Sequence, residues 1–128
     1  DTTTALDALA AAGLPLGIVT SKRSENALRA MKSTGIDGYF KFIVAPDTFP
    51  AHKPEPEPVL HGCELLGVSP QECIYIGDSP YDLQAGRGAE CTTVAALWGM
   101  FDAEALAAEH PDFAINSLSE LVPIAVGE

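Results

Sequence analysis

The sequence predicts an α/β fold: a three-layer, Rossmann-like, mostly parallel sheet with helices on both faces. Short runs rich in β-branched and aromatic residues alternate with helical patterns in units of about 25–35 residues, an alternation typical of parallel sheets. The chain has 128 residues, which fits one domain spanning residues 1–128. Its hydrophobic content of 47% is enough for a buried core and too high for a disordered chain.

Strands are predicted at residues 16–19, 42–45, 73–76, 92–97 and 113–115. The run 16–19 has the apolar character of a short buried strand, and the run 113–115 is predicted to lie at an edge of the sheet. The third run leads directly into Gly77, Asp78, Ser79 and Pro80, a combination that favours a turn followed by a helix start.

Three helices are predicted in the first half, and each ends near a glycine that can adopt the left-handed conformation of a helix C-terminus. The first covers residues 5–12, the second begins at Ser24 as its N-cap, and the third has Pro56 or Pro58 in its first turn. The glycines are Gly13, Gly35 and Gly67.

Three more helices are predicted in the second half. A helix rich in small residues follows Pro80, and Asp102 can cap a short helix that runs through Glu109. Ser117 and Glu120 have the spacing of a capping box, which predicts a last short helix.

Composition excludes several classes of protein. With 18 acidic and 7 basic side chains the net charge is −11, which disfavours nucleic acids and anionic membranes as partners. No stretch reaches the roughly 18–20 apolar residues of a membrane span, and no signal peptide is evident, so we expect a cytoplasmic protein.

Cys63, Cys73 and Cys91 form no CxxC pair and are expected to be reduced and buried.

Polar side chains follow three of the predicted strands, at the edge of a parallel sheet where ligands usually bind. Thr20 and Ser21 follow the first strand, Lys53 follows the second, and Asp78 and Asp82 follow the third. Hydroxyl groups and backbone N–H groups at a strand–helix junction can donate to phosphate, and a lysine can neutralise it. The sequence therefore favours a phosphate site.

The two aspartates add a possible metal to this site. Asp78 and Asp82 lie four residues apart across a turn into a helix, where their oxygens could share one Mg²⁺. Each residue alone has a plainer interpretation, namely a helix cap, a solvated lysine or turn chemistry, and their order after successive strands favours the site. His52 is expected to be an ordinary loop side chain, with contact to substrate as the alternative.

Three runs in this order resemble the motifs of a known family. They are Gly17-Ile18-Val19-Thr20-Ser21-Lys22, His52-Lys53-Pro54-Glu55-Pro56, and a GDxxxD motif within Ile74-Tyr75-Ile76-Gly77-Asp78-Ser79-Pro80-Tyr81-Asp82. With them the chain resembles the haloacid dehalogenase-like (HAD) hydrolases, most closely the phosphoglycolate phosphatase-like and pyrophosphatase-like branch. The resemblance implies a HAD-like core and Mg²⁺-dependent hydrolysis of a small phosphorylated metabolite.

The resemblance also implies a role for each candidate residue. Thr20 would hydrogen-bond the transferring phosphoryl group, with Ser21 beside it, and Lys53 would balance charge between the phosphate and a nucleophilic aspartate. Asp78 would bind Mg²⁺, and Asp82 would support the metal or Lys53. In the family an aspartate attacks phosphorus, a second aspartate protonates the leaving group, and water then hydrolyses the aspartyl-phosphate.

The family's first motif, DxDxT after an apolar strand, is not found in the sequence. In the family it lies on the central strand of the sheet, so the usual strand order would have a hole in its middle. We expect the chain to be the carboxy-terminal part of a longer enzyme and inactive alone. Only 33 residues separate Thr20 from Lys53, which leaves no room for a cap domain there.

Other functions remain open. The retained aspartates and lysine without the nucleophile also fit a catalytically inactive binding module, a pseudo-phosphatase. A dehalogenase of the same superfamily would not need the metal that the full GDxxxD motif favours. A flavodoxin-like receiver would carry its acidic cluster at the first strand. If the chain stands alone, the neighbours of the missing strand must pair directly or a partner must fill the gap.

Overall fold

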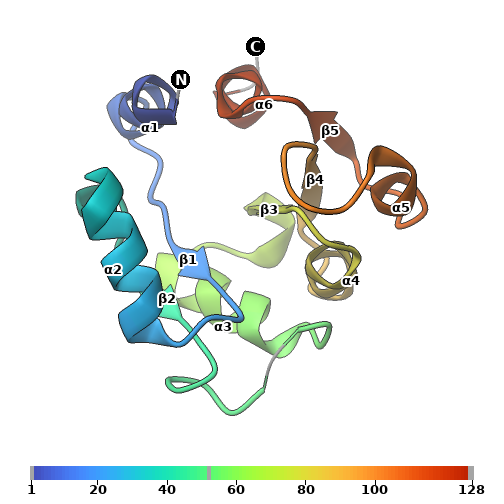
Figure 1. The fold of residues 1–128 in the computed structure, drawn as a ribbon, viewed down its shortest axis with the longest axis horizontal. Coiled ribbons are helices and arrows are strands. Elements are labelled where there is room, and N and C mark those ends of the chain that lie inside the picture. The colour runs from blue at the N-terminus through green and yellow to red at the C-terminus, as the bar shows by residue number, and fades with distance from the viewer. Residues whose placement is uncertain (1, 52, 127–128) are drawn as a thin grey trace.

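The computed structural model describes residues 2–51 and 53–126, and within them it confirms the α/β fold with parallel strands (Figure 1). The strands are β1 (Ile18–Val19), β2 (Ile43–Val44), β3 (Ile74–Gly77), β4 (Thr92–Ala96) and β5 (Phe113–Ile115). They form two separate sheets, β1-β2 and β3-β4-β5, with β5 at an edge as predicted. All five predicted strands are therefore present at or near the expected residues.

Helices connect the strands. They are α1 (Thr2–Ala11), α2 (Ser24–Thr34), α3 (Glu57–Leu66), α4 (Pro80–Gly88), α5 (Ala103–Ala107) and α6 (Leu121–Val126), with short 3₁₀ turns at Asp37–Tyr39, Pro70–Glu72 and Leu118–Glu120. Gly35 and Gly67 end α2 and α3 with φ of 74° and 75°, a left-handed backbone that other residues adopt only with strain.

The start of α2 differs from the prediction. Ser24 is the first helical residue, and the extended Arg23 stands at the N-cap. Asp47, in the loop after β2, takes the capping role instead. Its carboxylate accepts hydrogen bonds from the Ser24 N–H at 2.7 Å and the Ser24 Oγ at 2.5 Å, and these bonds lower the Asp47 pKa. The prediction was wrong because the cap comes from a residue distant in sequence.

The later helix starts follow the sequence closely. Asp102 Oδ1 accepts the Ala105 N–H at 2.8 Å, and Glu120 Oε2 accepts the Ser117 N–H at 2.9 Å, which confirms both predicted caps. Helix α5 ends at Ala107 rather than at Glu109. No helix in the described parts of the chain is long and apolar enough to cross a membrane.

Apolar clusters cover both faces of the strands. On one face α3 and α4 pack through Val59, Cys63 and Ala85 against Tyr75 of β3. On the other face Leu9 of α1 and Leu121 of α6 pack against Val94 and Ile115 of the sheet. All three cysteines are free and buried, as predicted. The helices on both faces thus define the three layers.

Within residues 2–51 and 53–126 no strand pairing joins the two sheets, because β1 and β3 belong to different ladders. The strands that would flank a missing central strand therefore do not pair directly. Direct pairing was one of the two arrangements that the sequence left open, and it is not the one observed. An apolar cavity of about 510 Å³ is lined by residues of β1, β3, α1, α3 and α6. Figure 1 shows the two sheets on opposite sides of the centre of the molecule, with α3 beside β1.

Candidate active site

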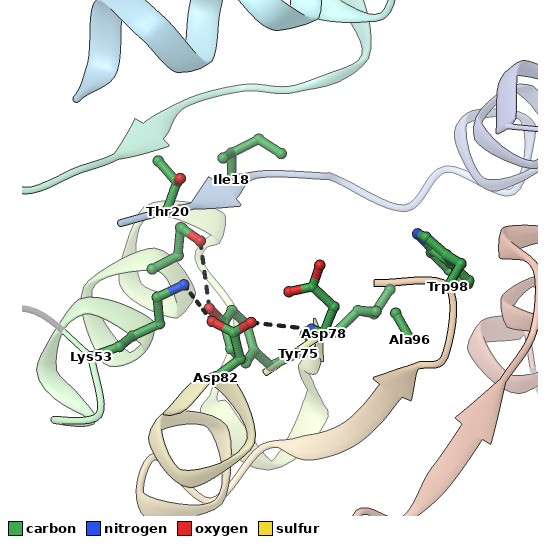
Figure 2. A pocket seen from close by; sticks show the side chains of 11 residues that line it. Ile18, Thr20, Lys53, Tyr75, Asp78, Asp82, Ala96 and Trp98 are labelled. Atoms are coloured by element: carbon green, nitrogen blue, oxygen red, sulfur yellow. Dashed lines mark hydrogen bonds and ion pairs between the residues drawn. The ribbon is translucent and has the colours of Figure 1, made fainter. Parts of the chain in front are cut away.

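A polar pocket of about 320 Å³ lies at the carboxyl ends of β1 and β3 (Figure 2). Four of the predicted site residues line it, and they come from three segments of the chain: Thr20, Lys53, Asp78 and Asp82. Ser21 is exposed and does not line the pocket, and His52 lies outside the described residues. Chain topology thus brings together side chains up to 62 residues apart (82 − 20).

Lys53 and Asp82 form a buried ion pair. Lys53 Nζ lies 2.5 Å from Asp82 Oδ1, and the two side chains are only 9% and 11% exposed. The other carboxylate oxygen of Asp82 accepts the backbone N–H of Asp78 at 3.1 Å. Both oxygens of Asp82 therefore have partners within the protein, and the carboxylate holds the Lys53 ammonium at the pocket (Figure 2).

Gly77 allows this arrangement. A Cβ at position 77 would lie 2.1 Å from the Asp82 Cβ, a distance that atoms cannot occupy. Asp82 is fixed from its other side as well, because its N–H donates to the Ser79 Oγ at 3.1 Å, where Ser79 caps α4. The Gly-Asp-Ser sequence after β3 thus fixes where the buried carboxylate lies.

Asp78 is exposed, and its carboxylate points into the open part of the pocket (Figure 2). The loop after β4 lies against it: a Cβ at Gly99 would come within 2.6 Å of the Asp78 Cβ and Oδ2. Gly99 was not among the predicted site residues. Its place directly after a strand, next to the pocket-lining Trp98, is the signal that could have identified it.

Thr20 lies at the end of β1, where its N–H donates to the Val44 carbonyl at 2.9 Å. Its Oγ1 accepts the Lys22 N–H at 3.1 Å, which turns the chain away from the strand toward α2. The hydroxyl hydrogen of Thr20 is left for another acceptor. An anion in the pocket would meet this hydroxyl on one side and the Lys53 ammonium on another.

Tyr75 is a pocket residue that the sequence did not single out. Its hydroxyl donates to the Val19 carbonyl at 3.4 Å, so this side chain bridges β3 to β1 across the space between the sheets. Burial, and then the nearby Asp82 carboxylate, raise the Tyr75 pKa, so the phenol stays protonated and remains a donor. Lys53 Nζ lies 6.0 Å from the centroid of its ring.

Among the described residues that line the pocket, Asp78 is the carboxylate best placed to bind Mg²⁺ directly. Asp78 is open to the pocket, whereas both oxygens of Asp82 are engaged. No group of three or more His, Cys, Asp or Glu side chains suited to a metal occurs in residues 2–51 and 53–126. Mg²⁺ in phosphoryl-transfer sites commonly binds one or two carboxylates together with waters and phosphate oxygens, and Asp78 fits that pattern. Direct ligation by Asp82 stays a prediction.

Comparison with known proteins identifies the class of this site. The family model of the haloacid dehalogenase-like hydrolases matches residues 1–96. The chain is 38% identical over 119 residues to the pyrophosphatase PpaX of Bacillus velezensis, covering 93% of this chain and 55% of the relative. It is 40% identical over 116 residues to the phosphoglycolate phosphatase of Chromobacterium violaceum, covering 91% of this chain and 51% of the relative.

Solved structures agree with this result. The HAD phosphatase of Thermococcus onnurineus superposes with a TM-score of 0.84 at 35% identity, covering 100% of this chain and 58% of that protein. A Haemophilus somnus protein described as a predicted phosphoglycolate phosphatase superposes with a TM-score of 0.89 at 28% identity, covering 95% of this chain and 54% of that protein. The chain belongs to the haloacid dehalogenase-like hydrolases, and it spans about half the length of the relatives that it matches.

Proposed function

We propose that this chain is the carboxy-terminal part of a Mg²⁺-dependent phosphatase that hydrolyses a small phosphorylated metabolite. The observation that carries the proposal is the buried Lys53–Asp82 pair, held at 2.5 Å beside Asp78 and Thr20 at one edge of the fold. A positive charge placed next to hydroxyl and carboxylate groups suits a phosphoryl group and a hard cation. The family and the names of the relatives support the same chemistry.

Each residue has a defined role in this proposal. Lys53 neutralises the phosphoryl oxygens, and Asp82 keeps the lysine in place. The Thr20 hydroxyl donates to the phosphoryl group. Ser21, the next residue of the loop, is exposed outside the pocket lining and has no direct role in this proposal. Asp78 is the metal ligand that this chain contributes. Bound Mg²⁺ would supply charge neutralisation to the transferring group.

The nucleophile lies outside this chain in the proposal. Asp78 and Asp82 are the two acidic residues that line the pocket in the described parts of the chain, and both have other roles. We place the attacking aspartate, and the aspartate that protonates the leaving group, on a segment upstream of residue 1. The intermediate is then an aspartyl-phosphate, and residues 1–128 alone turn over little or no substrate.

A phosphate-release assay tests the proposal. The polypeptide with its upstream segment is assayed with phosphoglycolate, pyrophosphate and a panel of small phosphate esters, with Mg²⁺ and with EDTA. We expect release of phosphate only with Mg²⁺, and loss of release in Asp78→Asn. Absence of metal-dependent phosphate release across the panel would contradict the phosphatase proposal.

A second candidate is a catalytically inactive binding module. It is favoured because the two carboxylates of the described pocket lining, Asp78 and Asp82, serve as metal ligand and lysine partner in the proposal and neither is its nucleophile. Such a module would bind inorganic phosphate without turnover. Calorimetry with phosphate on the longer polypeptide, together with the assay above, separates the two: binding without release in any ester assay would favour the module.

A further inference from the structure

Three thiols meet in the apolar layer between α3 and the three-stranded sheet. Cys73 and Cys91 are the residues directly before β3 and β4. The ladder pairs Ile74 with Thr92, so the two cysteines stand side by side at the start of neighbouring strands. Cys63 comes from α3 and packs against them in the same buried cluster. The fold thus gathers three free cysteines that are distant in sequence into one thiol cluster.

One pair within the thiol cluster is in direct contact. The Sγ atoms of Cys63 and Cys91 lie 3.6 Å apart, where either thiol can donate to the other. A disulfide has an S–S distance of about 2.05 Å, so the two sulfurs must approach by roughly 1.5 Å. The apolar cavity of about 510 Å³ borders both residues and leaves room for that movement, which a fully packed core would resist.

We propose that Cys63 and Cys91 are a modification site, which hydrogen peroxide oxidises to a disulfide while Cys73 stays a free thiol. One sulfur attacks a peroxide oxygen, which gives a sulfenic acid and one water. The second thiol then attacks the sulfur of the sulfenic acid, the S–S bond forms and a second water leaves. Two thiols lose two electrons and two protons, and one hydrogen peroxide becomes two waters.

Contact between the two sulfurs decides the product, whereas burial decides the rate. Burial raises the pKa of Cys63 and of Cys91, so little thiolate is present at neutral pH and the first step is slow. Once a sulfenic acid has formed, the partner sulfur is already in contact and reacts before a second peroxide arrives. We therefore expect a slow reaction whose product is one disulfide rather than sulfinic acids.

The disulfide ties α3 to the start of β4. Helix α3 begins four residues after Lys53 (57 − 53) and also contacts β1, so the cross-link joins an element beside the two-stranded sheet to the three-stranded sheet. A dithiol reductant reverses it. The inference does not depend on the proposed function, because disulfides are mapped without substrate, and a failed phosphatase assay leaves it standing.

The separation of the cysteines along the chain makes the predicted pair specific. Cys63 and Cys73 are 10 residues apart (73 − 63), whereas Cys63 and Cys91 are 28 apart (91 − 63). In an unfolded chain the entropic cost of closing a loop rises with its length, which favours the shorter loop by roughly fivefold. The fold therefore selects a pair that the unfolded chain disfavours.

The test treats residues 1–128 with hydrogen peroxide in native buffer and in urea, blocks the remaining thiols and maps the disulfides by peptide mass spectrometry. In native buffer we expect the loss of two thiols and a Cys63–Cys91 disulfide as the main product. In urea we expect the Cys63–Cys73 disulfide to exceed it. If circular dichroism shows that residues 1–128 do not fold alone, the polypeptide with its upstream segment is mapped instead, with the same expected pair.

Cys73→Ala provides the matched control. It keeps both partners of the proposed disulfide and removes the third thiol of the cluster. We expect the Cys63–Cys91 disulfide in unchanged yield in native buffer. A loss of disulfide in this variant would assign the reaction to Cys73 and contradict the proposed pair.

Three results on the unaltered protein would overturn the inference. The first is a native distribution of disulfides that matches the one found in urea. The second is oxidation of Cys63 or Cys91 to sulfinic acid without a disulfide. The third is retention of all three free thiols under peroxide conditions that oxidise them in urea.

Discussion

The three-stranded and two-stranded sheets differ in how well they are packed. In the β3-β4-β5 sheet Val94 and Ile115 are fully or almost fully buried, and strand β4 has a neighbour on both sides. In the β1-β2 sheet each strand is two residues long, and Ile18 and Val19 remain half-buried. The second sheet has Val44 as its fully covered residue and packs through Val19 against the cluster around Val59 and Cys63. The polar pocket is built from both.

The largest effect is expected at the ion pair that fixes the pocket. Lys53→Met leaves the Asp82 carboxylate buried without its counter-charge, because both side chains are almost fully covered. We expect a loss of about 3–5 kcal/mol in the free energy of unfolding of residues 1–128. In the longer polypeptide we expect phosphatase activity to fall roughly 10²-fold or more.

The matched control is Lys41→Met, at an exposed position. It should change the free energy of unfolding by less than about 0.5 kcal/mol. Denaturant unfolding of both variants is the measurement. Equal stability of the two variants would show that the Lys53–Asp82 pair does not hold the pocket together.

The next effect tests the loop that lies against Asp78. Gly99→Ala places a methyl group within 2.6 Å of the Asp78 Cβ and Oδ2, so the carboxylate must move. We expect activity of the longer polypeptide to fall roughly ten- to a hundredfold with folding retained. Gly38→Ala, where an added Cβ meets nothing within 4 Å, is the control and should keep full activity. Equal activity of the two variants would remove Gly99 from the site.

Much of the fold was predictable because its signals are local. Strand β3 and the capping box at Ser117 and Glu120 depend on neighbouring residues, and both are present as predicted. Ser24 was assigned the wrong role because Asp47, 23 residues away, forms the cap. Tyr75 and Gly99 escaped prediction for the same reason, since a phenol reaching Val19 and a glycine against Asp78 follow from packing between segments distant in sequence.

The candidate site was predictable in part. The order of polar residues after successive strands indicated Thr20, Lys53, Asp78 and Asp82, and these four line one pocket. The pattern did not show that both carboxylate oxygens of Asp82 would accept hydrogen bonds from the protein itself, one from Lys53 and one from the Asp78 N–H. It also did not separate Ser21, which is exposed outside the pocket lining, from Thr20, because adjacent residues share the sequence signal.

A smaller effect is expected at the Tyr75 hydrogen bond, which joins β3 to β1. Tyr75→Phe removes the hydroxyl that donates to the Val19 carbonyl at 3.4 Å. We expect a loss of about 0.5–1.5 kcal/mol in the free energy of unfolding. Tyr81→Phe, at an exposed tyrosine, should cost almost nothing and serves as the control. If the two substitutions cost the same, Tyr75 does not connect the sheets.

A pH dependence is expected at Cys73, which lines the apolar cavity between the sheets. Burial raises the Cys73 pKa from 9.0 to about 12, so the folded state binds a proton that the unfolded state has lost between these values. This contribution to stability is complete below pH 9 and is lost as pH rises toward 12. We expect the Tm to fall over that range, and to fall less in Cys73→Ala. An identical alkaline slope in both proteins would contradict the assignment.

The central claim is the proposal that this chain is the carboxy-terminal part of a longer enzyme, and it implies that a strand of the upstream segment lies between β1 and β3 and joins the two sheets. Amide hydrogen exchange at Val19, Ile74 and Ile76 tests it most directly, with the Thr20 and Thr92 amides, already bonded to neighbouring strands, as references. We expect the amides of Val19, Ile74 and Ile76 to exchange rapidly in residues 1–128 and to be protected about 10²-fold or more in the longer polypeptide. Equal protection of these amides in both proteins would contradict the claim.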